Sequence, residues 1–111
     1  MAESYIEVSS QDFPEKVLQA PQMVLVNVWT ENSGACKIQE PEFEAVSKEY
    51  QGRAVFAKLN ADTNGELVNQ WHVDGVPTII FFKSGREINR IKGIMMRDRL
   101  RRQIEGALLA N

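Results

Sequence analysis

The side chains able to do chemistry in this chain are few, and the most reactive of them is the single cysteine, Cys36. Cys36 follows Ser33-Gly34-Ala35 and opens a run of apolar residues at helical spacing. A lone cysteine does thiol chemistry only if it is exposed and acidified. One cysteine excludes an internal disulfide, and one histidine, His72, excludes a multi-histidine metal site. We expect neither a metal nor a cofactor.

Ser33 is the best candidate for the N-cap of this helix, because a serine hydroxyl can accept from the N–H groups of the first turn. The hydroxyl does not ionise near neutral pH, and no general base is close in sequence, which argues against a serine hydrolase. Pro41 lies further along the same helical pattern, where a proline either breaks or kinks a helix. Local sequence leaves both outcomes open.

The composition predicts a single domain over residues 1–111. The chain has 111 residues, of which 43% are hydrophobic, enough for one core. No apolar run is long enough to cross a bilayer, and the start MAESYIEV does not resemble a secretory signal. We therefore expect a cytoplasmic monomer that binds no membrane.

Basic residues are concentrated at the end of the chain. Acidic residues outnumber basic ones up to residue 82, and the reverse holds over residues 83–111. No aromatic residue alternates with the arginines, so this segment is interpreted as a solvated helix face, and no nucleic-acid partner is expected.

The hydrophobic pattern predicts strands that alternate with helices. Strands are expected near residues 5–8, 23–29, 54–59, 79–82 and 88–91. Helices are expected after Ser9 or Ser10, after Ser33, after Asn64-Gly65, and over Met96 to Leu109. Alternation favours parallel pairing, and the turn Ser84-Gly85 favours an antiparallel hairpin at the end. The expected fold is α/β, a mixed five-stranded sheet with helices on both faces.

Six segments, in order and at compatible spacing, resemble the thioredoxin family over nearly the whole chain. They are Val24 to Trp29, Ser33-Gly34-Ala35-Cys36-Lys37, Pro41, Lys58 to Asp62, Gly75-Val76-Pro77-Thr78 and Gly93. The resemblance implies the thioredoxin fold, thiol–disulfide exchange in cell redox homeostasis, and a cis Val76–Pro77 peptide bond. A cis bond before proline costs only about 0.5–1 kcal/mol.

The same resemblance assigns catalytic positions, and two of them have changed. Ser33 stands where the family has its attacking cysteine, which makes the motif an atypical Ser-Gly-Ala-Cys. Asn27 stands where the family has a buried aspartate that accepts a proton from the second cysteine, here Cys36. Lys58 matches the lysine near that aspartate and is expected to lack a carboxylate partner. Two-thiol reductase activity is therefore predicted to be lost or strongly reduced, and whether the chain is an enzyme stays open.

The resemblance also implies a substrate-binding groove. Carried over residue by residue, it comprises Trp29, Gly34, Ala35, Val76, Pro77 and Gly93. The family binds extended peptides there, and the peptide backbone pairs with the residue before the cis-proline. The expected partner is a protein or peptide with an extended segment, which can carry a disulfide.

Three hypotheses remain open at this point. In the first, Cys36 acts alone and forms mixed disulfides with glutathione or a protein, and an external thiol completes the exchange. The alternative for Cys36 is a purely structural role as a small buried apolar residue. In the second, the groove binds peptides without catalysis. In the third, the natural protein has cysteine at position 33 and this chain is an engineered Cys-to-Ser variant, although Asn27 would remain unusual in such a reductase.

Overall fold

The protein is described by a computed structural model that covers residues 4–110. Its elements follow in the order β1 (Ile6–Val8), η1 (Pro14–Leu18), β2 (Met23–Trp29), α1 (Gly34–Glu49), β3 (Ala54–Asn60), α2 (Gly65–Gln70), β4 (Thr78–Lys83), β5 (Arg86–Lys92) and α3 (Arg97–Ala110). The five predicted strands and the three longer predicted helices are all present.

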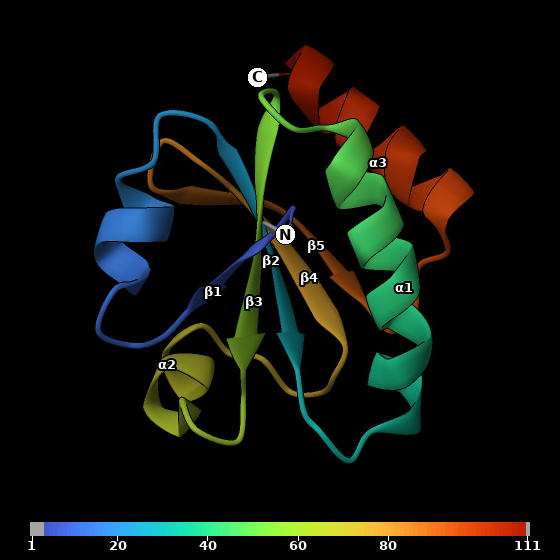
Figure 1. The fold of residues 1–111 in the computed structure, drawn as a ribbon. Coiled ribbons are helices and arrows are strands. Elements are labelled where there is room, and N and C mark those ends of the chain that lie inside the picture. Colours follow the sequence, from blue (N-terminus) through green and yellow to red (C-terminus); the bar gives the residue numbers. More distant parts are fainter. Residues whose placement is uncertain (1–3, 111) are drawn as a thin grey trace.

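The strands form one mixed five-stranded sheet (Figure 1). Its spatial order is β1-β3-β2-β4-β5, with β3 parallel to both β1 and β2. Strand β4 runs antiparallel to β2 and to β5. The predicted α/β class with a mixed sheet is confirmed. The hairpin between β4 and β5 turns at Ser84 and Gly85, which both have positive φ, as a two-residue hairpin turn requires.

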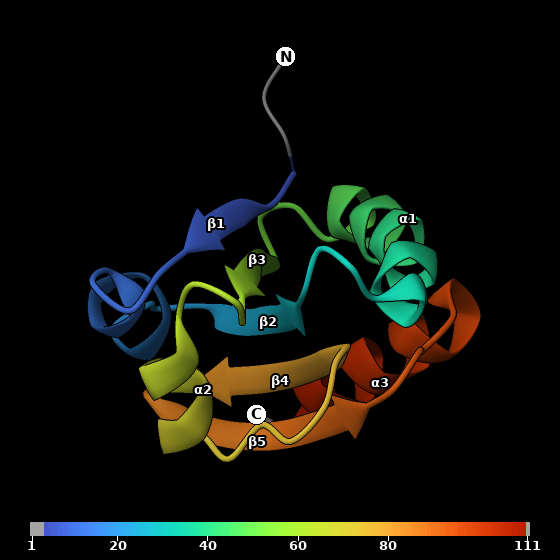
Figure 2. The same cartoon turned by 90° about the horizontal axis from the view of Figure 1, so that it is seen from below.

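Helices cover both faces of the sheet (Figure 2), with α1 and α3 on one side and α2 on the other. The first face packs Phe43, Val46, Leu100 and Ile104 against Leu25, Phe56 and Phe81. The opposite face packs Phe13, Val17 and Leu67 against Val24, Val26 and Phe82. Burial on both sides explains why β2 is a nearly continuous apolar run in the sequence.

The alternation of side chains along β2 and β3 decides where the polar groups of the core point. Leu25 on β2 and Phe56 on β3 belong to the core beneath α1 and α3. Because side chains alternate with a period of two, Asn27 and Lys58 face the same helices. They are also direct neighbours in the β2–β3 register.

One local expectation is wrong, and one that was left open is decided. The first helical segment is only the short π-helical turn η1, which begins at Pro14 and has no side-chain cap. Neither predicted cap serves it: the backbone N–H of Ser9 donates to Asp12 at 2.6 Å, and the Ser10 hydroxyl donates to Asn64 at 3.0 Å. Of the two outcomes left open for Pro41, a break is excluded, because α1 continues from Gly34 to Glu49.

The basic C-terminal segment pairs with acidic residues of α1. Arg97 on α3 donates to both carboxylate oxygens of Glu42, and Arg101 does the same to Glu49. Two of the arginines that were expected on a solvated helix face therefore form ion pairs with α1. Within residues 4–110, no helix is long and apolar enough to cross a membrane.

Candidate functional site

The predicted site residues converge at one end of the sheet. Strand β2 ends at Trp29, β4 begins at Thr78, and α1 begins at Gly34. The antiparallel register places Val28 opposite Thr78, so Trp29 comes opposite Pro77. Gly93 follows β5 at the same end, where its N–H donates to the Pro77 carbonyl at 2.9 Å.

The side chain of Ser33 caps α1. Ser33 has extended backbone angles, and its Oγ accepts the backbone N–H of Cys36 at 3.1 Å. The predicted N-cap is therefore present. The hydroxyl is engaged with the helix, and within residues 4–110 no hydrogen bond joins it to the imidazole of His72, so Ser33 has no general base to activate it.

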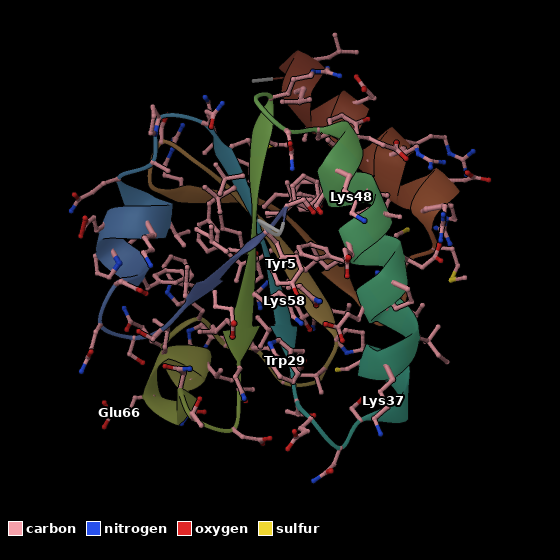
Figure 3. All side chains as sticks on the ribbon, in the orientation of Figure 1. Tyr5, Trp29, Lys37, Lys48, Lys58 and Glu66 are labelled. Carbon is pink, nitrogen blue, oxygen red and sulfur yellow. The ribbon has the colours of Figure 1, made fainter. Side chains whose placement is uncertain are left out.

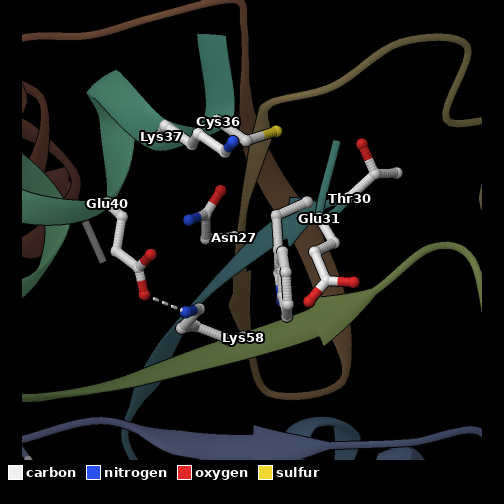
Figure 4. A pocket seen from close by; sticks show the side chains of 8 residues that line it. Asn27, Thr30, Glu31, Cys36, Lys37, Glu40 and Lys58 are labelled. Carbon is white, nitrogen blue, oxygen red and sulfur yellow. Dashed lines mark hydrogen bonds and ion pairs between the residues drawn. The ribbon is translucent and has the colours of Figure 1, made fainter. Parts of the chain in front are cut away.

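Cys36 is buried in the first turn of α1, with 5% of its surface exposed. Its side chain borders a cavity of about 290 Å³ between α1 and strands β2 and β3 (Figure 4). The cavity is lined by Asn27, Trp29, Thr30, Glu31, Cys36, Lys37, Glu40 and Lys58. A space of this size admits several water-sized molecules beside Cys36.

Asn27 lies between Cys36 and Lys58 in this cavity (Figure 4). It is 1% exposed, and its Oδ1 accepts no hydrogen bond from the residues that the structure describes. An unpaired buried acceptor costs about 1–3 kcal/mol. An amide cannot take up a proton at any ordinary pH, so Asn27 offers Cys36 no acid–base partner.

Lys58 does have a carboxylate partner, contrary to expectation. Its Nζ donates to Oε1 of Glu40, which reaches down from α1 (Figure 4). The ammonium also lies 4.6 Å from the centroid of the Trp29 ring. The expectation was wrong because it considered only the neighbouring strand. The carboxylate comes from the helix packed above it, one turn after Cys36.

Val76 and Pro77 form the second half of the site. The peptide bond between them is cis. The Thr78 hydroxyl donates to the Gly75 carbonyl at 2.7 Å and the Gly93 N–H donates to Pro77, so both sides of Val76 are tied down. The backbone N–H and C=O of Val76 make no hydrogen bond to any other residue within 4–110. They are free to pair with an added strand.

Arg90 on β5 holds the segment that leads to Val76. Its guanidinium donates to the carbonyls of Trp71 at 2.7 Å and His72 at 3.0 Å, and to the carboxylate of Glu87. These carbonyls lie just after α2, where a helix leaves acceptors unpaired. His72 itself is exposed and has a positive φ of 56°.

The structure thus forms two adjoining groups from the predicted residues. Asn27, Trp29, Cys36 and Lys58 line the cavity, whereas Val76, Pro77 and Gly93 form the loop side. Sequence reasoning missed Glu40 and Arg90. Glu40 could have been found from its spacing, because a residue four positions after Cys36 lies on the same helix face. No local signal pointed to Arg90.

Ion pairs near the site fix α1 against α3. Hydrogen bonds from the Arg97 side chain and backbone lower the pKa of Glu42 to about 2. Burial, together with a hydrogen bond to Glu105, raises the pKa of Tyr50 to about 12. Gln39 adds a neutral link, since it accepts the Met95 N–H at 2.7 Å and donates to the Met95 carbonyl. These contacts hold the helix that carries Ser33, Cys36 and Glu40.

The chain has too few thiols for an internal two-thiol cycle. Internal disulfide exchange needs an attacking thiol and a resolving thiol, and the chain has one. Among the described residues, no group of histidine, cysteine, aspartate and glutamate side chains could hold a metal ion.

Comparison with known proteins identifies the family. The sequence model described as Thioredoxin matches residues 4–106. A thioredoxin of Pseudomonas aeruginosa is 38% identical over 85 residues, which cover 77% of this chain and 79% of that protein. A thioredoxin of Synechocystis is 30% identical over 99 residues, or 89% of this chain and 92% of that protein. A thioredoxin of Chlorobaculum thiosulfatiphilum is 28% identical over 104 residues, or 94% and 96%.

Proposed function

Since this chain belongs to the thioredoxin family, we propose that it binds extended protein segments in the groove beside Pro77 and that it has lost two-thiol reductase turnover. The family works by thiol–disulfide exchange on protein substrates. In this account the chain still recognises an extended protein segment but no longer completes the catalytic cycle of the family.

One observation carries the proposal: Ser33 caps α1 through its Oγ at the position of the family's attacking thiol. The cap satisfies the N–H of Cys36, and the helix keeps its first turn without a nucleophile there. The neutral Asn27 beside Cys36 supports the same conclusion, because the proton acceptor of the family's cycle is also gone.

Binding needs no thiol. An extended segment can pair with the free N–H and C=O of Val76, in the manner of an added β-strand. Trp29 lies across from Pro77, and Ile94 and Met96 beyond Gly93 are exposed apolar side chains. Together these features offer hydrogen bonds to a backbone and apolar contacts to its side chains.

The test is a titration with S-carboxymethylated insulin B chain, a polypeptide without free thiols, followed by amide NMR. We expect shifts at Val76 and Gly93 in the chain and in a Cys36→Ser variant alike. Trp29→Ala is expected to weaken binding about tenfold or more. Leu109→Ala, on the exposed end of α3, is the matched control and is expected to bind normally. Equal affinity of Trp29→Ala and the parent chain would show that this groove is not the binding site.

A second candidate function is single-thiol exchange at Cys36, favoured by the cavity that reaches its side chain. The thiolate would attack a small disulfide such as oxidised glutathione, form a mixed disulfide and release glutathione thiolate. Mass spectrometry after incubation with oxidised glutathione tests this function. A glutathione adduct on the folded chain supports it, and modification only after unfolding excludes it.

We also propose that the chain acts as a cytoplasmic monomer. A reducing compartment suits a protein whose only cysteine has no partner for a disulfide. Light scattering of the purified chain tests the monomer, and fractionation of cells that express it tests the location.

A further inference from the structure

The ammonium of Lys58 lies between two aromatic rings. It is 4.6 Å from the centroid of Trp29 and 5.1 Å from that of Tyr5. Figure 3 shows the three side chains following one another between β1 and the lower end of the sheet. The Lys58 side chain is only 9% exposed, so its charge depends on protein partners in place of water.

Glu40 supplies the counter-charge. Its carboxylate accepts from Lys58 Nζ, and it is the only acidic group bonded to Lys58 in the described part of the chain. Asn27, the neighbour of Lys58 in the sheet register, is neutral and makes no hydrogen bond to it within residues 4–110. The position of the ammonium is therefore set from α1.

This ammonium rests against the ring of the groove residue. A cation within about 6 Å of an indole centroid is attracted to its face and restricts the orientation of the ring. Trp29 is only half-buried and ends β2, so packing alone holds it on fewer sides than a core residue. The contact with Lys58 provides a defined position for one face of the indole.

We infer that Glu40 and Lys58 are positioning residues for Trp29. Glu40 fixes the ammonium, and the ammonium fixes the indole at the edge of the groove. The inference deepens the proposed peptide-binding function and rests on it only for the effect on affinity. It links three elements through one chain of contacts: Glu40 on α1, Lys58 on β3 and Trp29 on β2.

Glu40→Gln is the informative substitution. Glutamine has nearly the shape of glutamate, and the Glu40 side chain is 46% exposed, so the change removes the charge without opening a cavity in the core. Glu44→Gln is the matched control, because Glu44 lies one turn further along α1 and pairs with the exposed Lys48. Lys58→Met removes the charge itself while it keeps the apolar stem.

Trp29 can be observed separately from the other tryptophan in a Trp71→Phe background. We expect Glu40→Gln to increase acrylamide quenching of Trp29 emission and to shift its indole N–H resonance, with no change for Glu44→Gln. Affinity for S-carboxymethylated insulin B chain is expected to fall about two- to tenfold. The indole resonance, measured also with Trp71 in place, gives the same readout without the background change.

A double-mutant comparison of Glu40→Gln and Lys58→Met distinguishes positioning of Trp29 from general destabilisation of the fold. If Glu40 acts through Lys58, adding Glu40→Gln to Lys58→Met changes nothing further. Additive effects, or a Trp29 signal that ignores Glu40→Gln, would overturn the inference. If Trp29 responds as expected but even the parent chain fails to bind the insulin probe, the proposed function fails and the positioning of Trp29 stands.

Discussion

At the scale of residues, the site is defined by the cap that Ser33 forms on α1 and by the ion pair between Lys58 and Glu40. The cap formed by Ser33 follows from its place before a helical pattern, and it is present. The partner of Lys58 could not be read from β2 alone, because Glu40 comes to it only when α1 packs on the sheet. That positions 27 and 33 carry asparagine and serine, where the family resemblance predicts aspartate and cysteine, is read from the sequence alone.

The roles of Ser33 and Asn27 can be tested by restoring the family's residues in turn. Ser33→Cys alone is expected to recover part of the reductase activity, because the new thiol gains Cys36 as its resolving partner. Adding Asn27→Asp is expected to raise the rate further, most clearly near neutral pH, since general-base assistance contributes about 10²–10⁴-fold. Insulin reduction coupled to a thioredoxin reductase measures both variants.

The activity of the Ser33→Cys variant also bears on whether the serine at position 33 is natural or engineered. If Ser33→Cys alone already matched an ordinary thioredoxin, Asn27 would be a neutral replacement. The chain would then be best explained as a Cys-to-Ser variant of an active reductase.

At the scale of elements, periodicity placed the strands and longer helices well and placed their ends and breaks less well. Pro41 was compatible with a break, yet α1 continues past it because its apolar face remains buried against the sheet and α3. Ser9 and Ser10 looked like caps, yet their hydrogen bonds go to Asp12 and Asn64. Competing side chains from other segments cannot be read from local sequence.

The contact between α1 and α3 is expected to weaken in acid. The pKa of Glu42 falls from an ordinary 4.5 to about 2 on folding, chiefly through hydrogen bonds from Arg97. Its ionised form therefore stabilises the fold above about pH 4.5, and that contribution is lost as the pH falls towards 2. Urea unfolding is expected to show Glu42→Gln less stable than the parent at pH 7, with the gap closing by pH 2. A gap that stays constant across this range would contradict the pairing.

Arg90 is expected to stabilise the segment from Trp71 to Val76. Replacing it with glutamine removes charged hydrogen bonds to two carbonyls and is expected to cost about 1–2 kcal/mol. Hydrogen exchange is expected to accelerate at amides 71–76. Arg86→Gln, on the exposed start of the same strand, serves as the control and is expected to leave exchange unchanged. Equal protection in both variants would show that Arg90 does not hold the segment.

At the scale of the whole molecule, the fold follows from a sheet that is buried on both faces. The apolar run of β2 and the alternation of strands with helices predicted the layers, and two separate cores realise them. Their packing brings the end of β2, the start of β4, the end of β5 and the start of α1 to one end of the sheet, where we propose the peptide-binding groove. The groove that we propose depends on the fold and not on the thiols, so the proposed binding does not require two-thiol chemistry.

The central claim is that this chain has lost two-thiol turnover. Its most direct test is the rate at which the unaltered chain reduces insulin disulfides when coupled to a thioredoxin reductase, without added small thiols. We expect a rate no higher than the reagent blank, with Ser33→Cys above the blank in the same assay. Sustained turnover by the unaltered chain would contradict the central claim, because it would show that Cys36 alone completes a cycle that requires two thiols.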